Sequence, residues 1–225
     1  MNGKIIRNPE APVSGSHRQI AVDDKVIRLQ EKVYLMLNKP RGVVTTASDE
    51  KGRKTVYTIL SGCSDGRERE TSPQGQPWVA PVGRLDRASE GLLLLTNDSE
   101  WGARIAAPQT HLDKTYHVQV GDVTDERFIG ALLRGVKTKD GIVLRAKQAQ
   151  RSRAGQTSSW LELVLDEGKN RQIRRMMESM GVEVLRLVRV SIGPLQLGDL
   201  GKGEYRALTV DEKRMLDRAM LEKTL

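Results

Sequence analysis

One segment constrains the fold more than any other: residues 83–98, where a charged turn runs directly into an uninterrupted apolar stretch. Four consecutive leucines, Leu92–Leu95, follow Arg84, Asp86 and Arg87. So short an apolar run predicts a strand buried on both faces, because a helix needs a longer segment. The preceding turn therefore mounts one carboxylate, that of Asp86, at the edge of a rigid sheet, with an arginine on each side.

The rest of the chain predicts an α+β domain built on a largely antiparallel sheet, because many strands are interspersed unevenly with few helices. A polar turn at residues 38–42 ends the first of these strands, and we expect long polar loops at residues 61–79 and Gln150–Ser159. Thr124 is predicted to cap a helix that runs through Arg134 and is stopped by Gly135, and Thr209 and Glu212 form a capping box for a C-terminal helix. The other predicted strands are Val33–Leu37, Thr115–Val120, Trp160–Leu165 and Val184–Ile192, and the core stripe of the first helix is Phe128, Ile129, Leu132 and Leu133.

Residues 1–30 stand apart from this domain and predict two short strands joined by a loop. Asn2-Gly3 is a tight-turn pair, and Ile20–Ile27 is expected to return as a strand. A hairpin alone is marginally stable in water, so this segment is expected to be the end of a larger module or a flap on the main domain.

The charge balance favours a polyanionic partner, because 37 Lys and Arg stand against 29 Asp and Glu, a net charge of +8. Cys63 is the single cysteine, and His17, His111 and His117 lack the spacing of metal ligands, so no metal site is expected. No apolar run is long enough for a membrane span or a signal core. These features predict a soluble cytoplasmic protein.

Asp86 and Tyr116 each allow a structural and a functional interpretation. An aspartate flanked by Arg84 and Arg87 is either a structural ion pair or an ionised acid held ready as a nucleophile or base. Tyr116 either packs with Val118 and Val120 on one strand face or presents its ring to an unpaired base. Lys114, in turn, is either a solvated surface lysine or a phosphate contact.

A basic helix is predicted after Gly168. Its apolar stripe of Ile173, Met176, Met177 and Met180 is most simply explained as core packing. Lys169, Arg171, Arg174 and Arg175 supply cations before the first acid, Glu178. Arg171 and Arg175 are expected to face solvent, whereas Arg174 lies at the border of the stripe, where it could lean into a cleft. This basic face is either merely solvated or a contact for an RNA backbone.

Residues 83–98, 114–118 and 166–177 resemble the three sequence motifs of pseudouridine synthases, in the branch typified by ribosomal small-subunit pseudouridine synthase A and including synthases B, E and F of the large ribosomal subunit. The resemblance extends over residues 33–220 and includes Lys39-Pro40-Arg41-Gly42. It implies the fold of that family, a largely antiparallel mixed central sheet flanked by helices. Residues 1–30 would be a remnant of an S4-like RNA-binding domain, and residues 31–225 the catalytic domain.

The same resemblance implies the roles of individual residues. Asp86 would be the essential carboxylate, Tyr116 would lie against the target base, Arg174 would meet the aspartate, and Ile173 would help to wall the uracil pocket. Arg84 would belong to the active site, and the RNA backbone would be held by Arg87, Lys114, Lys169, Arg171 and Arg175. Asp86 could attack the sugar C1′ or remove the C2′ proton, and the sequence leaves both routes open.

The implied activity is isomerisation of a specific uridine to pseudouridine in structured RNA, most simply ribosomal RNA or a pre-ribosomal particle, by a monomer without a cofactor. One alternative is a catalytically silent RNA-binding or ribosome-assembly protein with the same fold. Another is an unrelated aspartate hydrolase, which would need a second acid, base or metal near Asp86. Asp98 is a poor candidate for that second acid, because it is expected at the other end of the Leu92–Leu95 strand.

Overall fold

The structure is a computed structural model that describes residues 5–8, 20–22, 25–27, 30–46, 49–61, 77–110, 112–122 and 124–222. The chain divides into two units, residues 1–32 and residues 33–225. In the first unit, β1 (Ile20–Val22) and β2 (Lys25–Ile27) pair antiparallel, with Val22 opposite Lys25. The single strand expected over Ile20–Ile27 is therefore wrong, because two paired strands lie within this segment. The Asn2-Gly3 turn lies outside the described residues.

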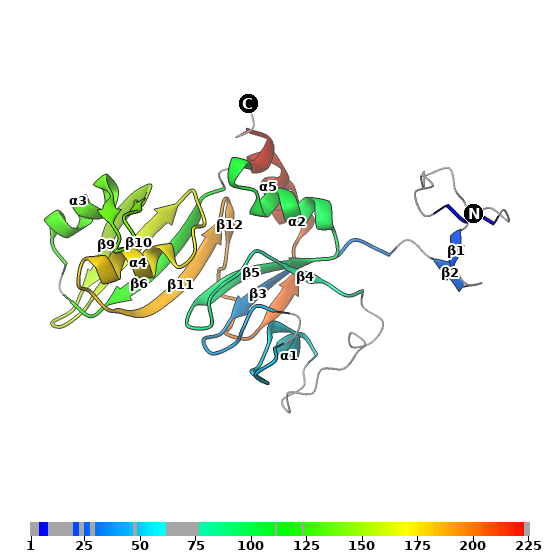
Figure 1. Cartoon of the computed structure of the whole chain (residues 1–225), viewed down its shortest axis with the longest axis horizontal. Helices are drawn as coiled ribbons and strands as arrows, with labels where there is room; N and C mark the ends of the chain where they lie inside the picture. Colours follow the sequence, from blue (N-terminus) through cyan, green and yellow to red (C-terminus); the bar gives the residue numbers. More distant parts are fainter. Residues whose placement is uncertain are drawn as a thin grey trace. The chain divides into compact units, whose positions relative to one another are not determined.

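A mixed sheet forms the framework of the second unit (Figure 1). Among the described strands every pairing is antiparallel except that between β5 and β11. In spatial order the strands are β13 (Tyr205–Ala207), β3 (Tyr34–Lys39), β5 (Glu90–Thr96), β11 (Val184–Ile192), β6 (Lys114–Val120), β10 (Ser159–Leu165) and β9 (Gln148–Ala154), with β4 (Ala80–Val82) on β5 and β12 (Leu195–Gln196) on β11. The predicted α+β class is confirmed.

The sheet splits along one edge of β5. The start of this strand pairs with β11 through Val188↔Glu90 and Arg189↔Gly91, whereas its end pairs with β4 through Leu94 to Thr96. Two different strands thus share the same edge, and they diverge on either side of the turn that joins β4 to β5. This divergence opens the sheet beside Asp86.

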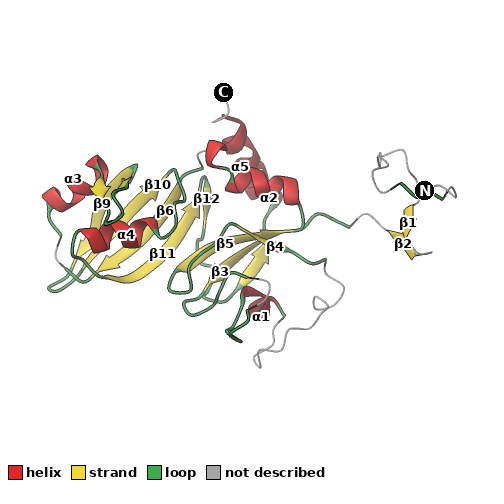
Figure 2. Ribbon diagram, viewed as in Figure 1, coloured by secondary structure: helices red, strands yellow, loops and turns green. Residues whose placement is uncertain are grey.

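Helices cover the sheet in separate groups (Figure 2). Residues of α3 (Glu126–Arg134) and α4 (Gln172–Ser179) pack on β6, β10 and β11 in one core cluster. Residues of α2 (Ser99–Ala106) and α5 (Val210–Glu222) pack with Leu92 and Leu94 of β5 in a second cluster. Val56 of α1 (Val56–Leu60) joins Leu93 and Leu95 in a third. A short 3-10 helix, Pro108–Thr110, and the hairpin of β7 (Val136–Lys137) and β8 (Val143–Leu144) complete the described elements.

The central prediction, a strand buried on both faces, is confirmed, since all seven residues of β5 are buried and its leucines alternate between two clusters. The strands predicted at Val33–Leu37, Thr115–Val120, Trp160–Leu165 and Val184–Ile192 are present, and β3 continues through Asn38 and Lys39, which were expected in a turn. The Thr209–Glu212 capping box is present too, with reciprocal hydrogen bonds of 3.1 and 2.8 Å.

Three local predictions are wrong in whole or in part. Of the loop expected over Gln150–Ser159, the residues up to Ala154 belong to the strand β9, and only residues 155–158 connect β9 to β10. This strand lies at the edge of the sheet, where both faces reach solvent and no apolar alternation marks it. Helix α3 is capped by Asp125, whose Oδ1 accepts from the Phe128 amide at 2.8 Å, and not by Thr124. Leu133, expected in its core stripe, is 40% exposed, because the buried face of α3 runs through Ile129 and Leu132. Most of the loop expected at 61–79 lies outside the described residues.

Gly91 is required where β5 meets β11. Its φ is +102°, and a Cβ at this position would lie 2.2 Å from the Arg189 carbonyl oxygen and 2.7 Å from the Arg189 amide nitrogen. Both neighbours are main chain in a paired strand, so neither can move without opening the sheet. Glycine therefore permits the close approach of the two parallel strands.

We expect Gly91→Ala to lower the free energy of unfolding by about 3 kcal/mol or more, because strain and a main-chain clash coincide. Gly181→Ala is the matched control, since Gly181 has a φ of +73° but a Cβ added there would meet nothing within 4 Å. This control should lose only about 1 kcal/mol. Denaturant unfolding of both variants measures the difference, and equal losses would contradict the close-approach argument.

Candidate active site

Asp86 lies in the turn between β4 and β5, and hydrogen bonds fix the main chain of this turn. The Ser89 amide donates to the Asp86 carbonyl at 2.9 Å, and the Gly42 amide donates to the Arg87 carbonyl at 2.7 Å. Next to the aspartate, Leu85 is buried in a core cluster and its carbonyl accepts from Thr45 at 2.9 Å. The Asp86 side chain itself remains 34% exposed. The turn therefore presents an accessible carboxylate from a rigid backbone.

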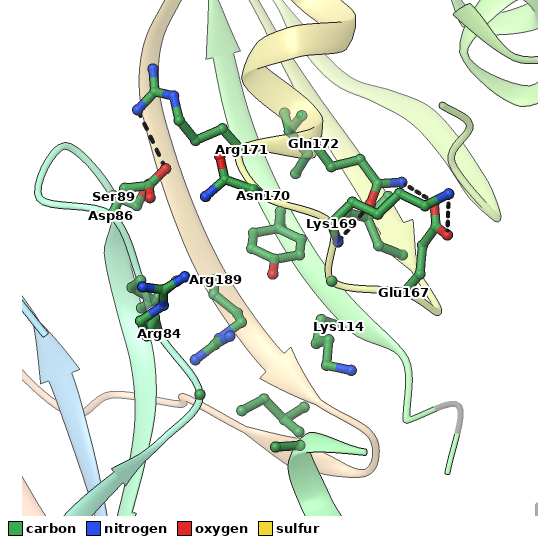
Figure 3. A pocket seen from close by; sticks show the side chains of 18 of the residues that line it. Arg84, Asp86, Ser89, Lys114, Glu167, Lys169, Asn170, Arg171, Gln172 and Arg189 are labelled. Atoms are coloured by element: carbon green, nitrogen blue, oxygen red, sulfur yellow. Dashed lines mark hydrogen bonds and ion pairs between the residues drawn. The ribbon is translucent and has the colours of Figure 1, made fainter. Parts of the chain in front are cut away.

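Arg171 makes the ion pair with this carboxylate: its Nη1 lies 3.5 Å from Asp86 Oδ2. Arg171 immediately precedes α4 in a left-handed conformation, with φ 49° and ψ 32°. Arg171 is exposed, as expected, with 51% of its side chain accessible, and this conformation also directs the side chain toward the β4–β5 turn (Figure 3).

Arg174, which the sequence motif implies as the partner of Asp86, instead binds main-chain oxygens. Its Nη2 donates to the Ala88 carbonyl at 2.9 Å and its Nη1 to the Val184 carbonyl at 3.4 Å. Burial lowers the pKa of Arg174, the positive charges of Arg171 and Arg41 lower it further, and the charge of Asp86 opposes the shift. Arg174 thus fastens the turn that carries Asp86 and contributes positive potential to it.

A cavity of about 540 Å³ opens beside Asp86, within the range of ligand sites in proteins. Tyr116 of β6 and Ile173 of α4 contribute to its walls, as the sequence analysis expected of a base pocket. Arg84, Lys114, Lys169, Arg171 and Arg174 also line it. The structure therefore brings eight of the ten candidate residues together around one hollow; Arg87 and Arg175 are not among its lining residues.

Several of the candidate cations are engaged with acids. Arg175, which was expected to face solvent, is 25% exposed and pairs with Asp140 at 2.6 Å, and Lys169 pairs with Glu167 at 2.8 Å. These pairs are partly exposed, and such pairs contribute little to stability. Each cation can therefore exchange its acid for another anion at a small cost in free energy.

Lys39 belongs to a motif that carried no predicted role, yet it contacts the turn that holds Asp86. Its side chain is fully buried, and its Nζ donates to the Ser89 carbonyl at 2.8 Å and to the Pro40 carbonyl at 3.0 Å. Burial lowers the pKa of Lys39 to about 8, against the opposing charges of Asp86 and Glu90. The available signal was a lysine at the end of an apolar strand, directly before a proline.

Glu90 begins β5 and joins three segments at the site. Arg186 donates to it at 3.0 Å, and Lys202 lies 2.9 Å from its other oxygen. Burial by itself raises the pKa of Glu90, but the hydrogen bonds from Arg186 and Lys202 outweigh it and lower the pKa.

Arg189 is a second residue that the sequence did not single out: it is buried on β11 and lines the cavity.

A metal site or a second catalytic acid would point to a different chemistry. Within the described residues, no group of three or more His, Cys, Asp or Glu side chains could hold a metal ion. His17, His111 and Cys63 lie outside those residues. Asp98 caps α2 at the far end of β5, as expected, and accepts from the Tyr34 hydroxyl at 2.8 Å. No described helix combines the length and apolarity of a membrane span.

A family model described as RNA pseudouridylate synthase matches residues 33–179, which include the β4–β5 turn, β6 and α4. The chain belongs to the RNA pseudouridylate synthase family. It is 37% identical over 218 residues to ribosomal large subunit pseudouridine synthase B of Bacillus subtilis, covering 96% of this chain and 84% of the relative. It is 35% identical to ribosomal large subunit pseudouridine synthase E of Vibrio parahaemolyticus, covering 81% and 76%.

A solved structure described as a pseudouridylate synthase superimposes with a TM-score of 0.69 at 29% identity, covering 96% of this chain and 86% of that chain. The family assignment makes this chain an isomerase whose partner is RNA. It does not favour the silent RNA-binding alternative, since the named relatives are synthases. The pseudouridine synthase fold expected from the motifs is confirmed.

The depressed pKa of Lys39 predicts a pH dependence of stability. Between about pH 8 and pH 10.5 the unfolded chain holds a proton on Lys39 that the folded chain has released. Stability therefore rises with pH in this window, because the penalty for burying the charge is removed. Relative to Lys39→Met, the native protein should gain up to about 3 kcal/mol from pH 8 to pH 10.5.

The measurement is denaturant unfolding of both proteins at several pH values. Only the difference between the two proteins is interpreted, because other groups titrate equally in both. Parallel curves would show that Lys39 keeps an ordinary pKa.

Proposed function

We propose that this synthase converts a specific uridine of ribosomal RNA into pseudouridine, with Asp86 as the catalytic carboxylate. The observation that carries the proposal is the position of Asp86: an accessible acid at the mouth of the cavity, 3.5 Å from the Arg171 guanidinium. A neighbouring arginine favours the ionised form of an aspartate, which is the form that can act as a nucleophile or a base.

The reaction breaks the bond between C1′ and N1 of the target uridine, turns the uracil over, and joins C5 to C1′. It neither oxidises nor reduces the substrate, so the chain's own residues can carry it. The carboxylate of Asp86 either attacks C1′ or removes the C2′ proton, and both routes require it to be ionised and within reach of the ribose. The rigid turn below Asp86 supports that requirement.

A uridine inside a helix must be flipped out of its stack before Asp86 can reach it, at a cost of a few kcal/mol. We propose that the extruded base enters the cavity and lies against Tyr116, with Ile173 on the α4 side. Tyr116 packs against the core on one side while lining the cavity, which holds its ring in place for stacking. Base stacking of this kind contributes about 1–3 kcal/mol.

We propose that the RNA backbone is held by the basic residues around the mouth. Arg84 and Arg87 are exposed, and Lys114 and Lys169 line the cavity. The exposed pairs Lys169–Glu167 and Arg175–Asp140 can open toward phosphates at small cost. Arg171, by contrast, serves first as the partner of Asp86. Binding should weaken with salt, as expected for phosphate contacts.

The substrate class is inferred from the relatives, whose names specify the large ribosomal subunit. We propose that the synthase acts as a monomer in the cytoplasm, on ribosomal RNA or a pre-ribosomal particle. We further propose that residues 1–30 correspond to the end of an S4-like RNA-binding domain; the short β1–β2 hairpin supports this. Residues 31–225 form the catalytic domain in this proposal.

Asp86→Asn tests the proposed catalyst. We expect turnover to fall by about a thousandfold or more, because an amide can neither attack C1′ nor accept the C2′ proton. RNA affinity should stay within about tenfold, since no backbone cation is removed. Asp125→Asn is the matched control: Asp125 only caps α3, and asparagine caps a helix equally well.

The assay maps pseudouridines in the ribosomal RNA of cells that lack the gene and then carry each variant. The proposal expects one site to vanish and to return with the native and Asp125→Asn proteins alone. Return of that site with Asp86→Asn would overturn the catalytic role, and an unchanged map would overturn the choice of ribosomal RNA.

Two substitutions that differ in side-chain size test the proposed stacking role of Tyr116. Tyr116→Phe keeps the ring and should retain activity within about tenfold, whereas Tyr116→Ala should lose about tenfold to a hundredfold in turnover, as one stacking contact is removed. Tyr205→Ala controls for the loss of an aromatic side chain elsewhere. Tyr205 is 38% exposed on β13, and its hydroxyl donates a hydrogen bond to the Leu60 carbonyl. Full activity of Tyr116→Ala would rule out the stacking role.

A further inference from the structure

Arg189 is a buried arginine whose hydrogen bonding is incomplete. It lies on β11 and is 5% exposed. Its Nε donates to the Leu92 carbonyl at 2.7 Å, which anchors the guanidinium from one side. Its Nη2 is shielded from solvent and has no hydrogen-bond partner among the described residues. A buried donor without a partner is unfavourable and calls for a physical explanation.

The side chain of Arg189 lines the same cavity as Asp86 (Figure 3). Tyr116 lines this cavity too. In the sheet, Arg189 is paired with Tyr116 of β6 on one side and with Gly91 of β5 on the other. The strand that carries Arg189, β11, therefore lies between β6, which carries Tyr116, and β5, which follows the Asp86 turn. A base stacked on Tyr116 with its ribose toward Asp86 would bring its polar edge to this guanidinium.

No carboxylate forms an ion pair with Arg189 in the described part of the chain. Three acids line the cavity: Asp86 pairs with Arg171, Glu167 pairs with Lys169, and Asp166 forms no ion pair with Arg189 in the described structure. A buried cation of this kind favours a ligand that carries or acquires negative charge within the cavity. A phosphate of the RNA backbone fits less well, because it stays hydrated near the surface, where the exposed Arg84 can meet it.

We propose that Arg189 donates a hydrogen bond to a carbonyl oxygen of the target uracil and stabilises the negative charge that the base gains during the reaction. This proposal rests on the proposed function. When the C1′–N1 bond breaks, both bonding electrons stay on the uracil and spread over N1, O2 and O4. C5 then forms its bond to C1′ and loses its proton, while N1 gains one, so the base ends neutral.

The charge is therefore present only between the two bond changes. A guanidinium that binds the carbonyl binds it more strongly in the anion than in the neutral base, and this difference accelerates the cleavage step. Removing one such donor from other enzymes lowers turnover by about 10²–10³ with little effect on binding. Arg189 would thus be a catalytic residue in addition to Asp86.

The test pairs an enzyme change with a substrate change. Full-length native protein, Arg189→Met and Arg189→Lys are assayed on an RNA fragment carrying the mapped uridine, and on the same fragment with 2-thiouridine or 4-thiouridine at that position. Sulfur is a poorer hydrogen-bond acceptor than oxygen. The readout is the single-turnover release of tritium from C5, with RNA affinity measured separately.

We expect Arg189→Met to slow tritium release by about 10²–10³, with RNA affinity within about threefold. One of the two sulfur substitutions should slow the native enzyme by about tenfold or more, and should slow Arg189→Met by less than about threefold. Which substitution behaves in this way identifies the carbonyl oxygen. Arg206→Met is the matched control, since Arg206 pairs with Glu212 and does not line the cavity; it should respond to sulfur as the native enzyme does.

Equal sulfur effects in the native and Arg189→Met enzymes, with both thio substrates, would overturn the proposal, as would a native rate for Arg189→Met. If Arg189→Met fails to fold, as judged by thermal unfolding, Arg189→Lys carries the same comparison, because lysine keeps the charge but has one nitrogen in place of the guanidinium. A different result would show that the proposed function itself is wrong: the native enzyme would then release no tritium from the unsubstituted fragment.

Discussion

The short parallel contact between β5 and β11 is the constraint on which the site depends. It joins the strand that follows the Asp86 turn to the strand that carries Arg189, and it is possible only because Gly91 has no side chain. Beyond this contact β4 takes over the edge of β5, and the sheet opens. The cavity is therefore a consequence of the sheet topology.

Within this opening the protein distributes its positive charges unequally. Lys39 and Arg174 hold the carbonyl oxygens of Ser89 and Ala88, whereas only Arg171 is ion-paired with the Asp86 carboxylate among the described residues. Because Lys39 and Arg174 bind main-chain oxygens, they fix the turn without forming ion pairs with the Asp86 carboxylate. The carboxylate thus keeps a positive surrounding and also keeps oxygen positions open for a substrate.

The sequence allowed the framework of this arrangement to be predicted, because its signals are local. The Leu92–Leu95 run predicted a doubly buried strand, and the spacing of Ile173, Met176 and Met177 predicted the buried face of α4. The polar strand β9 was missed, since an edge strand exposed on both faces carries no apolar alternation.

The details of the site were harder to predict, because they depend on contacts between distant residues. Lys39 meets Ser89 across 50 positions, and Arg174 meets Ala88 across 86. The exchange of roles between Arg171 and Arg174 depends on the left-handed backbone of Arg171, which helical periodicity cannot indicate because the residue precedes the helix. Arg189 lies in a strand rich in β-branched residues and has no motif that distinguishes it.

At Arg171 the conformation that costs stability also places the guanidinium beside Asp86. A left-handed conformation in a residue with a Cβ costs on the order of 1 kcal/mol, which glycine would avoid. Glycine would also remove the guanidinium beside Asp86, the proposed catalytic acid. Selection for heat resistance alone would therefore favour losing this arginine, whereas selection for turnover would retain it, and the residue found in an evolved variant would report which pressure had been stronger.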